Sequence, residues 1–153
     1  MQFDRVTRPI DGVAKGALVL EVLLSIGALG GGFVLMLAPR GEIMPLPLSA
    51  LADSPFDTYF VPGMILFGVL GFGPLAAARL AWMHHPLGPV AAFIVGAGLL
   101  IWVAVEVAII GYSNEPPLQA IYGILGVAIV LVAIRWLLDV GLPQLHRNTA
   151  THV

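Results

Sequence analysis

The sequence predicts an all-α protein that is embedded in a membrane as a four-helix antiparallel bundle. The first observation behind this prediction is composition. Of the 153 residues, 59% are hydrophobic and only 10% are charged, and the mean hydropathy is +0.97. Soluble domains carry about 25% charged residues, and a soluble fold of this composition would expose large apolar patches. The second observation is that the apolar residues gather in four long runs, and the third is an uneven distribution of positive charge.

The four apolar runs are each long enough to cross a bilayer. As helix each measures roughly 31–39 Å at ~1.5 Å per residue, whereas the hydrocarbon core is about 30 Å thick. The runs are continuous and not alternating, which favours helices over a β-barrel. The predicted spans cover residues 16–37, 61–82, 87–112 and 118–138.

The first run has one alternative interpretation, a cleaved signal peptide, because Arg5, Arg8 and Lys15 precede it. However, the run exceeds the usual ~7–15 residues of a signal core, and no small-x-small cleavage site closes it. We therefore expect a retained span within a single transmembrane domain covering residues 1–153.

The basic residues predict the orientation, since lysine and arginine gather on the cytoplasmic side. With the N-terminus inside, only Arg40 lies outside. The basic residues on the cytoplasmic side are then Arg5, Arg8, Lys15, Arg79, Arg135 and Arg147. We expect a multi-pass protein of a bacterial inner (cytoplasmic) membrane, with both termini and a tail of residues 139–153 in the cytoplasm.

The segment 38–60 between the first two spans differs in kind from the other connections. Its prolines forbid a long helix, and its aromatic residues suit the headgroup level of a membrane. The residues concerned are Pro39, Pro45, Pro47, Pro55, Phe56, Tyr59 and Phe60. We expect a proline-rich extracytoplasmic cap with one short helix around 49–53.

Small residues are expected to pack the spans against one another, because lipid is as apolar as leucine and hydrophobicity alone cannot pull helices together. Gly27 and Gly31 have small-xxx-small spacing in the first span, and the other spans carry similar glycines. Pro74 is expected to kink the second span.

Charged residues inside the spans are costly, by ~2.5–3.5 kcal/mol near the bilayer centre. Arg79 and Arg135 are each near a cytoplasmic helix end, where a long side chain reaches the headgroups. Glu21 has a similar depth in the first span. We expect Glu21 to form a structural ion pair with Arg79 or Arg135 near the inner leaflet, the alternative being a binding or transport role.

Glu106 is expected about 9 Å from the outer end of the third span, with Trp102 one turn earlier on the same face. Gln119 and Tyr122 enter the membrane at a matching depth in the fourth span. These four residues predict either a small outward-facing polar pocket that binds a ligand, ion or proton, or a protonated carboxyl that fastens two helices.

Several chemistries have no support in the sequence. Cysteine is absent, which excludes disulfides, thiolate metal sites and cysteine nucleophiles. No serine lies in a G-x-S-x-G setting, and His84 and His85 are interpreted as a polar turn, not a metal site. No basic run suggests nucleic acid. We therefore predict no catalytic residues, no metal and no cofactor.

Several short motifs are spread over residues 17–135. They are Gly31-Gly32, Pro45-Leu46-Pro47-Leu48, Ser54-Pro55-Phe56, Tyr59, Pro62-Gly63, Trp102, Glu106-Val107 and Pro117-Leu118-Gln119-Ala120-Ile121-Tyr122-Gly123. Together they make the chain resemble a widespread group of small four-helix bacterial integral membrane proteins of uncharacterised function. The resemblance implies that the outer cap and the set of Trp102, Glu106, Gln119 and Tyr122 belong to that family's pattern, and it implies no activity.

Three classes of function remain from the sequence. The leading expectation is a non-enzymatic accessory or scaffold subunit that packs with itself, with other membrane subunits and with lipids. The alternative is a small carrier or binding protein for a lipid, a hydrophobic molecule or a proton, using the outer pocket at Glu106. A membrane enzyme is the weakest of the three.

Overall fold

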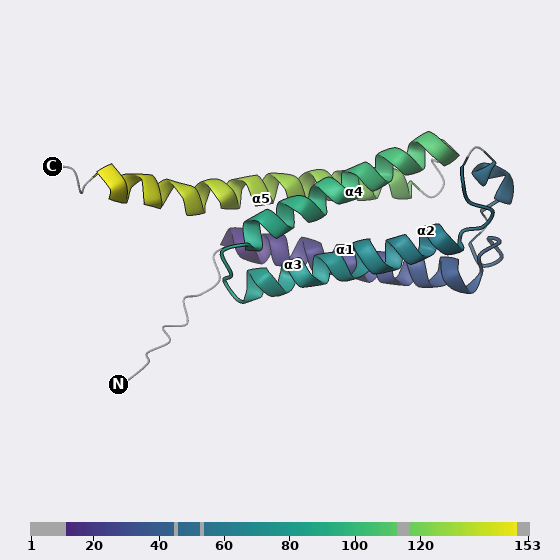
Figure 1. Ribbon diagram of the computed structural model, residues 1–153, viewed down its shortest axis with the longest axis horizontal. Helices are drawn as coiled ribbons and strands as arrows, with labels where there is room; N and C mark the ends of the chain where they lie inside the picture. The colour runs from purple at the N-terminus through teal and green to yellow at the C-terminus, as the bar shows by residue number, and fades with distance from the viewer. Residues whose placement is uncertain (1–11, 45, 53, 113–116, 150–153) are drawn as a thin grey trace, which may run out of the picture.

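The computed structural model describes residues 12–44, 46–52, 54–112 and 117–149, with only the backbone for 141–149 (Figure 1). Within these ranges the chain is helical and contains no strand. The elements are α1 (Gly12–Leu37), the 3₁₀ turn η1 (Leu48–Leu51), α2 (Phe60–Ile65), the π-helical turn η2 (Leu66–Gly71), α3 (Phe72–Trp82), α4 (Gly88–Ile110) and α5 (Leu118–Thr149).

Four helical stretches are long and apolar enough to cross a membrane, as the sequence predicted. Their mean hydropathies lie between 1.9 and 2.5. The second stretch is continuous through α2, η2 and α3. The four are Gly12–Leu37, Phe60–Trp82, Gly88–Ile110 and Leu118–Val140.

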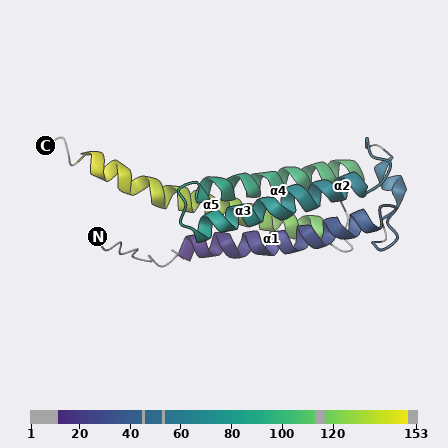
Figure 2. The ribbon, with the colours of Figure 1, turned by 60° about the horizontal axis from the view of Figure 1, so that its bottom comes forward.

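The fourth helix differs from its expected limits, because it does not end at residue 138. It continues to Thr149, and its last turns extend beyond the other helices (Figures 1 and 2). The sequence argument ended the helix where the apolar run meets Asp139. In the structure Asp139 pairs with Arg135 one turn earlier, at 3.1 Å, so this charge supports the helix at the point where the apolar run stops.

The helices associate as two closely packed pairs. α1 packs along α2, η2 and α3, whereas α4 packs along α5. Contacts between α3 and α4 and between α1 and α5 join the pairs, and Figure 2 shows all of these helices side by side.

Backbone contact at glycines brings each pair together. A Cβ on Gly32 of α1 would lie 2.7 Å from the carbonyl oxygen of Gly63 in α2, and one on Gly126 of α5 would lie 2.9 Å from the side chain of Leu100 in α4. Real Cβ atoms do not approach backbone this closely, so only glycine fits at Gly32, whereas at Gly126 the end of the Leu100 side chain would have to shift. Not every glycine serves this purpose, because Gly30 and Gly98 face open space.

The core of the bundle has two apolar layers. The alanine layer is nearest the start of α1 and consists of Ala14, Ala17, Ala81, Ala92, Ala133 and Trp136. The leucine layer begins about two turns after Ala17 along α1 and consists of Leu24, Ala28, Leu70, Leu99 and Ile129. Every long helical stretch contributes to both layers.

Segment 38–59 closes on itself at the end of the bundle opposite the start of α1 (Figure 2). The backbone N–H of Tyr59 donates to the carbonyl of Pro39 at 2.8 Å, and the Tyr59 hydroxyl donates to the carbonyl of Pro47 at 2.9 Å. Tyr59 is only 5% exposed, and η1 contacts α4. The expected short helix around 49–53 is present as η1, at Leu48–Leu51.

The glycine contacts give a first testable prediction. We expect Gly32→Ala to lower the free energy of unfolding by ~1–3 kcal/mol, because the added methyl group must displace backbone. The matched control is Gly30→Ala on the same helix, which meets no atom within 4 Å and should be neutral or slightly stabilising. Unfolding of both variants in mixed micelles, followed by circular dichroism, measures the difference. Equal effects of the two substitutions would contradict the packing described here.

Candidate functional site

Glu21 is the most unusual polar residue in the bundle. It lies about 13 Å along α1 from Gly12, at 1.5 Å per residue, and its side chain is 0% exposed. Neither carboxyl oxygen has a hydrogen-bond partner among the residues that the structure describes. Buried carboxyl groups almost always have partners, so this isolation calls for an explanation.

The ion pair expected between Glu21 and Arg79 or Arg135 is not formed. Arg79 is exposed, and Arg135 instead pairs with Asp139 on the surface of α5. The physical reason is the rotation of each helix. On α3 the inward positions hold Ala77, Ala78 and Ala81, so Arg79 points away from Glu21. Both arginines are free to reach the headgroups, as the sequence also suggested.

Ser25 extends the polar site by one helical turn. It lies four residues after Glu21, on the same face of α1, and is 0% exposed. Its hydroxyl donates to the carbonyl oxygen of Gly71 at 2.6 Å. This bond joins α1 to the last residue of the π-helical turn η2.

The π-helical turn has an identifiable cause in Pro74, which is fully buried. Proline has no N–H to donate and its ring clashes with the preceding turn, so the helix rearranges just upstream. The expected kink is therefore a widened turn over Leu66–Gly71. Ser25 supplies a side-chain donor there, as hydroxyl groups commonly do for the backbone of interrupted membrane helices.

Apolar residues enclose Glu21 on both sides along the bundle. Ala17 of the alanine layer precedes it on α1 and Leu24 of the leucine layer follows it. An unpaired carboxylate in such a place would cost several kcal/mol. Even the neutral acid carries an unsatisfied hydrogen-bonding group, at a cost of about 1–3 kcal/mol. Glu21 therefore destabilises the fold that contains it.

Sequence reasoning placed Glu21 at the right depth but missed its isolation and missed Ser25. A signal was present in the spacing. The buried positions of α1 include Ala14, Ala17, Leu24 and Ala28, which are separated by three, seven and four residues. Residue 21 divides the gap of seven into four and three, so that the spacings alternate between three and four. A heptad-like spacing of this kind marks the side of a helix that faces its neighbours.

The four residues proposed for an outer pocket do lie together. The Glu106 carboxyl accepts hydrogen bonds from the side chains of Trp102 and Gln119, and Tyr122 lies close to it. The Gln119 amide also donates to the carbonyl of Gly111 at 3.0 Å. The Tyr122 hydroxyl lies directly against Gly27 of α1.

This cluster joins α4 to α5 and reaches α1. In contrast to Glu21, Glu106 is only partly buried and has partners that satisfy it. The geometry favours the interpretation in which these side chains fasten helices, and a ligand-binding role for them stays a prediction.

The two acids predict stability changes of opposite sign. We expect Glu21→Met to raise the free energy of unfolding by about 1–3 kcal/mol, because an unsatisfied polar group is replaced by an adaptable apolar one. We expect Glu106→Ala to lower it by about 1–3 kcal/mol, because two donors lose their acceptor. Micelle unfolding measures both, with Asp57→Ala on the exposed outer segment as the neutral control. A loss of stability in the Glu21 variant as large as that in the Glu106 variant would refute the contrast.

Comparison of the chain with protein-family models, with curated proteins and with solved structures found no match. The resemblance to small four-helix bacterial membrane proteins stays a prediction, and the functional argument depends on the geometry of this chain alone.

Proposed function

We propose that this chain is a small, non-enzymatic membrane protein that binds and releases a proton inside its helical bundle. The carboxyl group of Glu21 is the binding group. The observation that carries the proposal is the complete burial of this acid with no partner among the described residues. An ionisable residue inside a membrane is expensive and is usually functional.

Glu21 differs from a structural acid in its effect on the stability of the fold. A structural acid is kept because its hydrogen bonds hold elements together, as those of Glu106 do. Among the described residues no hydrogen bond joins the Glu21 carboxyl to another helix. A methionine or leucine would pack in its place without the free-energy cost of an unsatisfied polar group. Residues that reduce stability without a structural benefit are characteristic of functional sites.

The neighbouring π-helical turn supports a site that can open. Bulges of this type occur frequently at functional sites, and this one contacts the Glu21 face of α1 through Ser25 and Gly71. A change in the turn would move α3, which carries Ala77, Ala78 and Ala81. Because Ala81 belongs to the alanine layer, that movement would open or close the path between Glu21 and the nearer membrane surface.

The arrangement in the membrane is part of the proposal. The four helices form an antiparallel bundle in a bacterial cytoplasmic membrane, with both termini in the cytoplasm and segment 38–59 as the outer cap. The distribution of lysine and arginine supports this orientation. The short connection from Met83 to Leu87 agrees with antiparallel packing of the second and third spans. The hydrogen bond from the Tyr59 hydroxyl to the Pro47 carbonyl agrees with a folded cap in segment 38–59.

The accessory-subunit role remains the second candidate from the sequence. No particular contact among the described residues favours it over the proton-binding role. Purification of a stoichiometric complex with other membrane subunits would support it.

The orientation is tested by cysteine accessibility, because the chain has no native cysteine. Ser49 and Met83 are both exposed, at opposite ends of the bundle. We expect an impermeant maleimide to label Ser49→Cys in intact cells and Met83→Cys only after permeabilisation. The reverse pattern would invert the topology, and labelling of both in intact cells would contradict the single crossing, Phe60–Trp82, that separates the two positions.

A carboxyl group that takes up a proton on one side of the membrane and releases it on the other would move protons across the bilayer. This consequence of the proposal is tested in vesicles that contain the purified full chain and a pH-sensitive dye. Under an imposed membrane potential, we expect the wild type to change the internal pH faster than empty vesicles do. Glu21→Gln should reduce the rate to that of empty vesicles, because an amide of the same shape cannot exchange the proton. The matched control is Glu42→Gln, an exposed acid outside the spans, which should retain the wild-type rate.

Two outcomes would overturn the proposal. In the first, Glu21→Gln vesicles behave as the wild type does. In the second, Glu106→Gln abolishes the pH change while Glu21→Gln does not, which would return the site to the outer cluster that the sequence suggested.

A further inference from the structure

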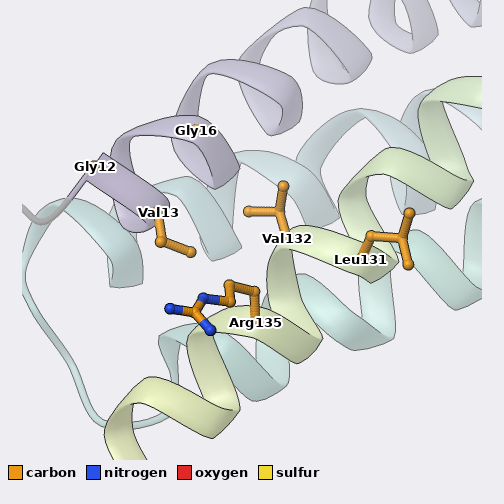
Figure 3. Close-up of a pocket in the computed structure, with 6 residues that line it drawn as sticks. All are labelled: Gly12, Val13, Gly16, Leu131, Val132 and Arg135. Carbon is orange, nitrogen blue, oxygen red and sulfur yellow. The ribbon is translucent and has the colours of Figure 1, made fainter.

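Two shallow apolar grooves lie between α1 and α5. The groove at the start of α1 has a volume of about 340 Å³ and is lined by Gly12, Val13, Gly16, Leu131, Val132 and Arg135 (Figure 3). The second has a volume of about 470 Å³ and is lined by Leu20, Leu23, Leu118, Ile121, Tyr122, Ile124, Leu125 and Ala128. Neither groove includes Glu21, whose side chain faces the interior of the bundle.

The two grooves follow one line along the molecule. On α1 the lining residues Gly12, Gly16, Leu20 and Leu23 recur every three or four positions, which places them on one face of the helix. The lining residues of α5 recur in the same way from Leu118 to Arg135, a rise of ~25 Å at 1.5 Å per residue. We call the two grooves together the α1–α5 seam.

The seam is open to the surroundings of the bundle. Leu23, Ile124 and Leu131 on its sides are 57%, 71% and 61% exposed. Gly16 leaves the floor open, because a Cβ placed there would meet only Val132, at 4.0 Å. An unbranched hydrocarbon chain is the shape that fits a long, narrow and apolar depression of this kind.

Positive charge is present at one end of the seam only. The Arg135 guanidinium extends toward the first turn of α1 and lies below Val13 and Val132 in the view of Figure 3. The start of α1 adds the positive end of the helix dipole. Asp139 partly offsets this charge through its ion pair with Arg135, but the Arg135 side chain remains 66% exposed.

We propose that the α1–α5 seam binds an anionic phospholipid. The phosphate lies at Arg135 and the first turn of α1, and one acyl chain lies along the apolar lining toward Leu23 and Ile124. The positive charge of Arg135 at one end of the seam favours an acidic headgroup. The apolar lining of the seam favours a ligand whose headgroup carries hydrocarbon chains. This proposal does not depend on the role of Glu21.

The matched control is Arg79, the other arginine at the same end of the bundle. It is exposed as Arg135 is, but it lies on α3 and lines neither groove. General attraction of arginine to acidic membranes would therefore act equally on both residues, whereas a specific site depends on Arg135 alone.

Native mass spectrometry of the full chain in micelles tests the proposal, with dioleoyl phosphatidylglycerol and dioleoyl phosphatidylcholine as probes. We expect the wild type to retain phosphatidylglycerol more strongly. Arg135→Gln should weaken that retention ~5-fold, the effect of one basic residue near a membrane surface. Arg79→Gln should leave retention unchanged. Asp139→Asn should strengthen it, because Arg135 then loses its competitor.

A second variant examines the apolar part of the site. Gly16→Leu fills the floor of the groove and should reduce retention of both lipids, with its thermal unfolding measured to confirm that it folds. If the Gly16→Leu variant does not fold, Arg135→Gln still tests the proposal, because it changes an exposed side chain and should leave the fold intact. Equal retention of the two lipids by the wild type, or equal losses in the Arg135 and Arg79 variants, would overturn the proposal. Displacement of the lipid by millimolar glycerol phosphate would also overturn it, since a headgroup without chains should not compete.

Discussion

Close contact between helix backbones is the constraint on which the rest of this structure depends. In lipid the helices gain nothing from hydrophobicity alone, so association requires surfaces that approach closely. Gly32 against Gly63 and Gly126 against Leu100 provide such surfaces within the two pairs. Once each pair is held at this distance, the inward positions of α1 are closed to water and lipid. The isolation of Glu21 is a direct consequence.

The two acids inside the bundle, Glu21 and Glu106, differ in hydrogen bonding because their neighbours differ. Glu106 faces Trp102 and Gln119, whose N–H groups satisfy the carboxyl, and the cluster joins two helices. Glu21 faces small and aliphatic side chains from the layers on either side, and its oxygens remain without partners among the described residues. Hydrogen bonding thus makes one acid part of the framework, and its absence leaves the other as a source of local instability.

The interrupted second span is held to α1 by a hydrogen bond inside their pair. Pro74 removes a backbone donor, the helix widens into η2, and Ser25 of α1 bonds to the carbonyl at its end. The α1–α5 seam lies on the other side of α1, where no such bond crosses between the described residues and the packing is shallow. Thus α1 is held firmly by one neighbour and loosely by the other, and each of these sides has its own proposed ligand.

The sequence by itself determined how many helices are long and apolar enough to cross a membrane and, apart from the end of α5, where they lie along the chain. Length and composition suffice for this, because a bilayer sets the length of an apolar helix. Tertiary structure alone decided which way each residue faces. It turned Glu21 inward and Arg79 and Arg135 outward, so the expected ion pair does not form. The physical reason is that a helix in lipid is apolar on every side, whereas a helix at the surface of a soluble protein shows its inner face as an apolar stripe. Without that stripe, rotation about the helix axis is set by small contacts such as those of Gly32 and Gly126, and these exist only once the helices have met.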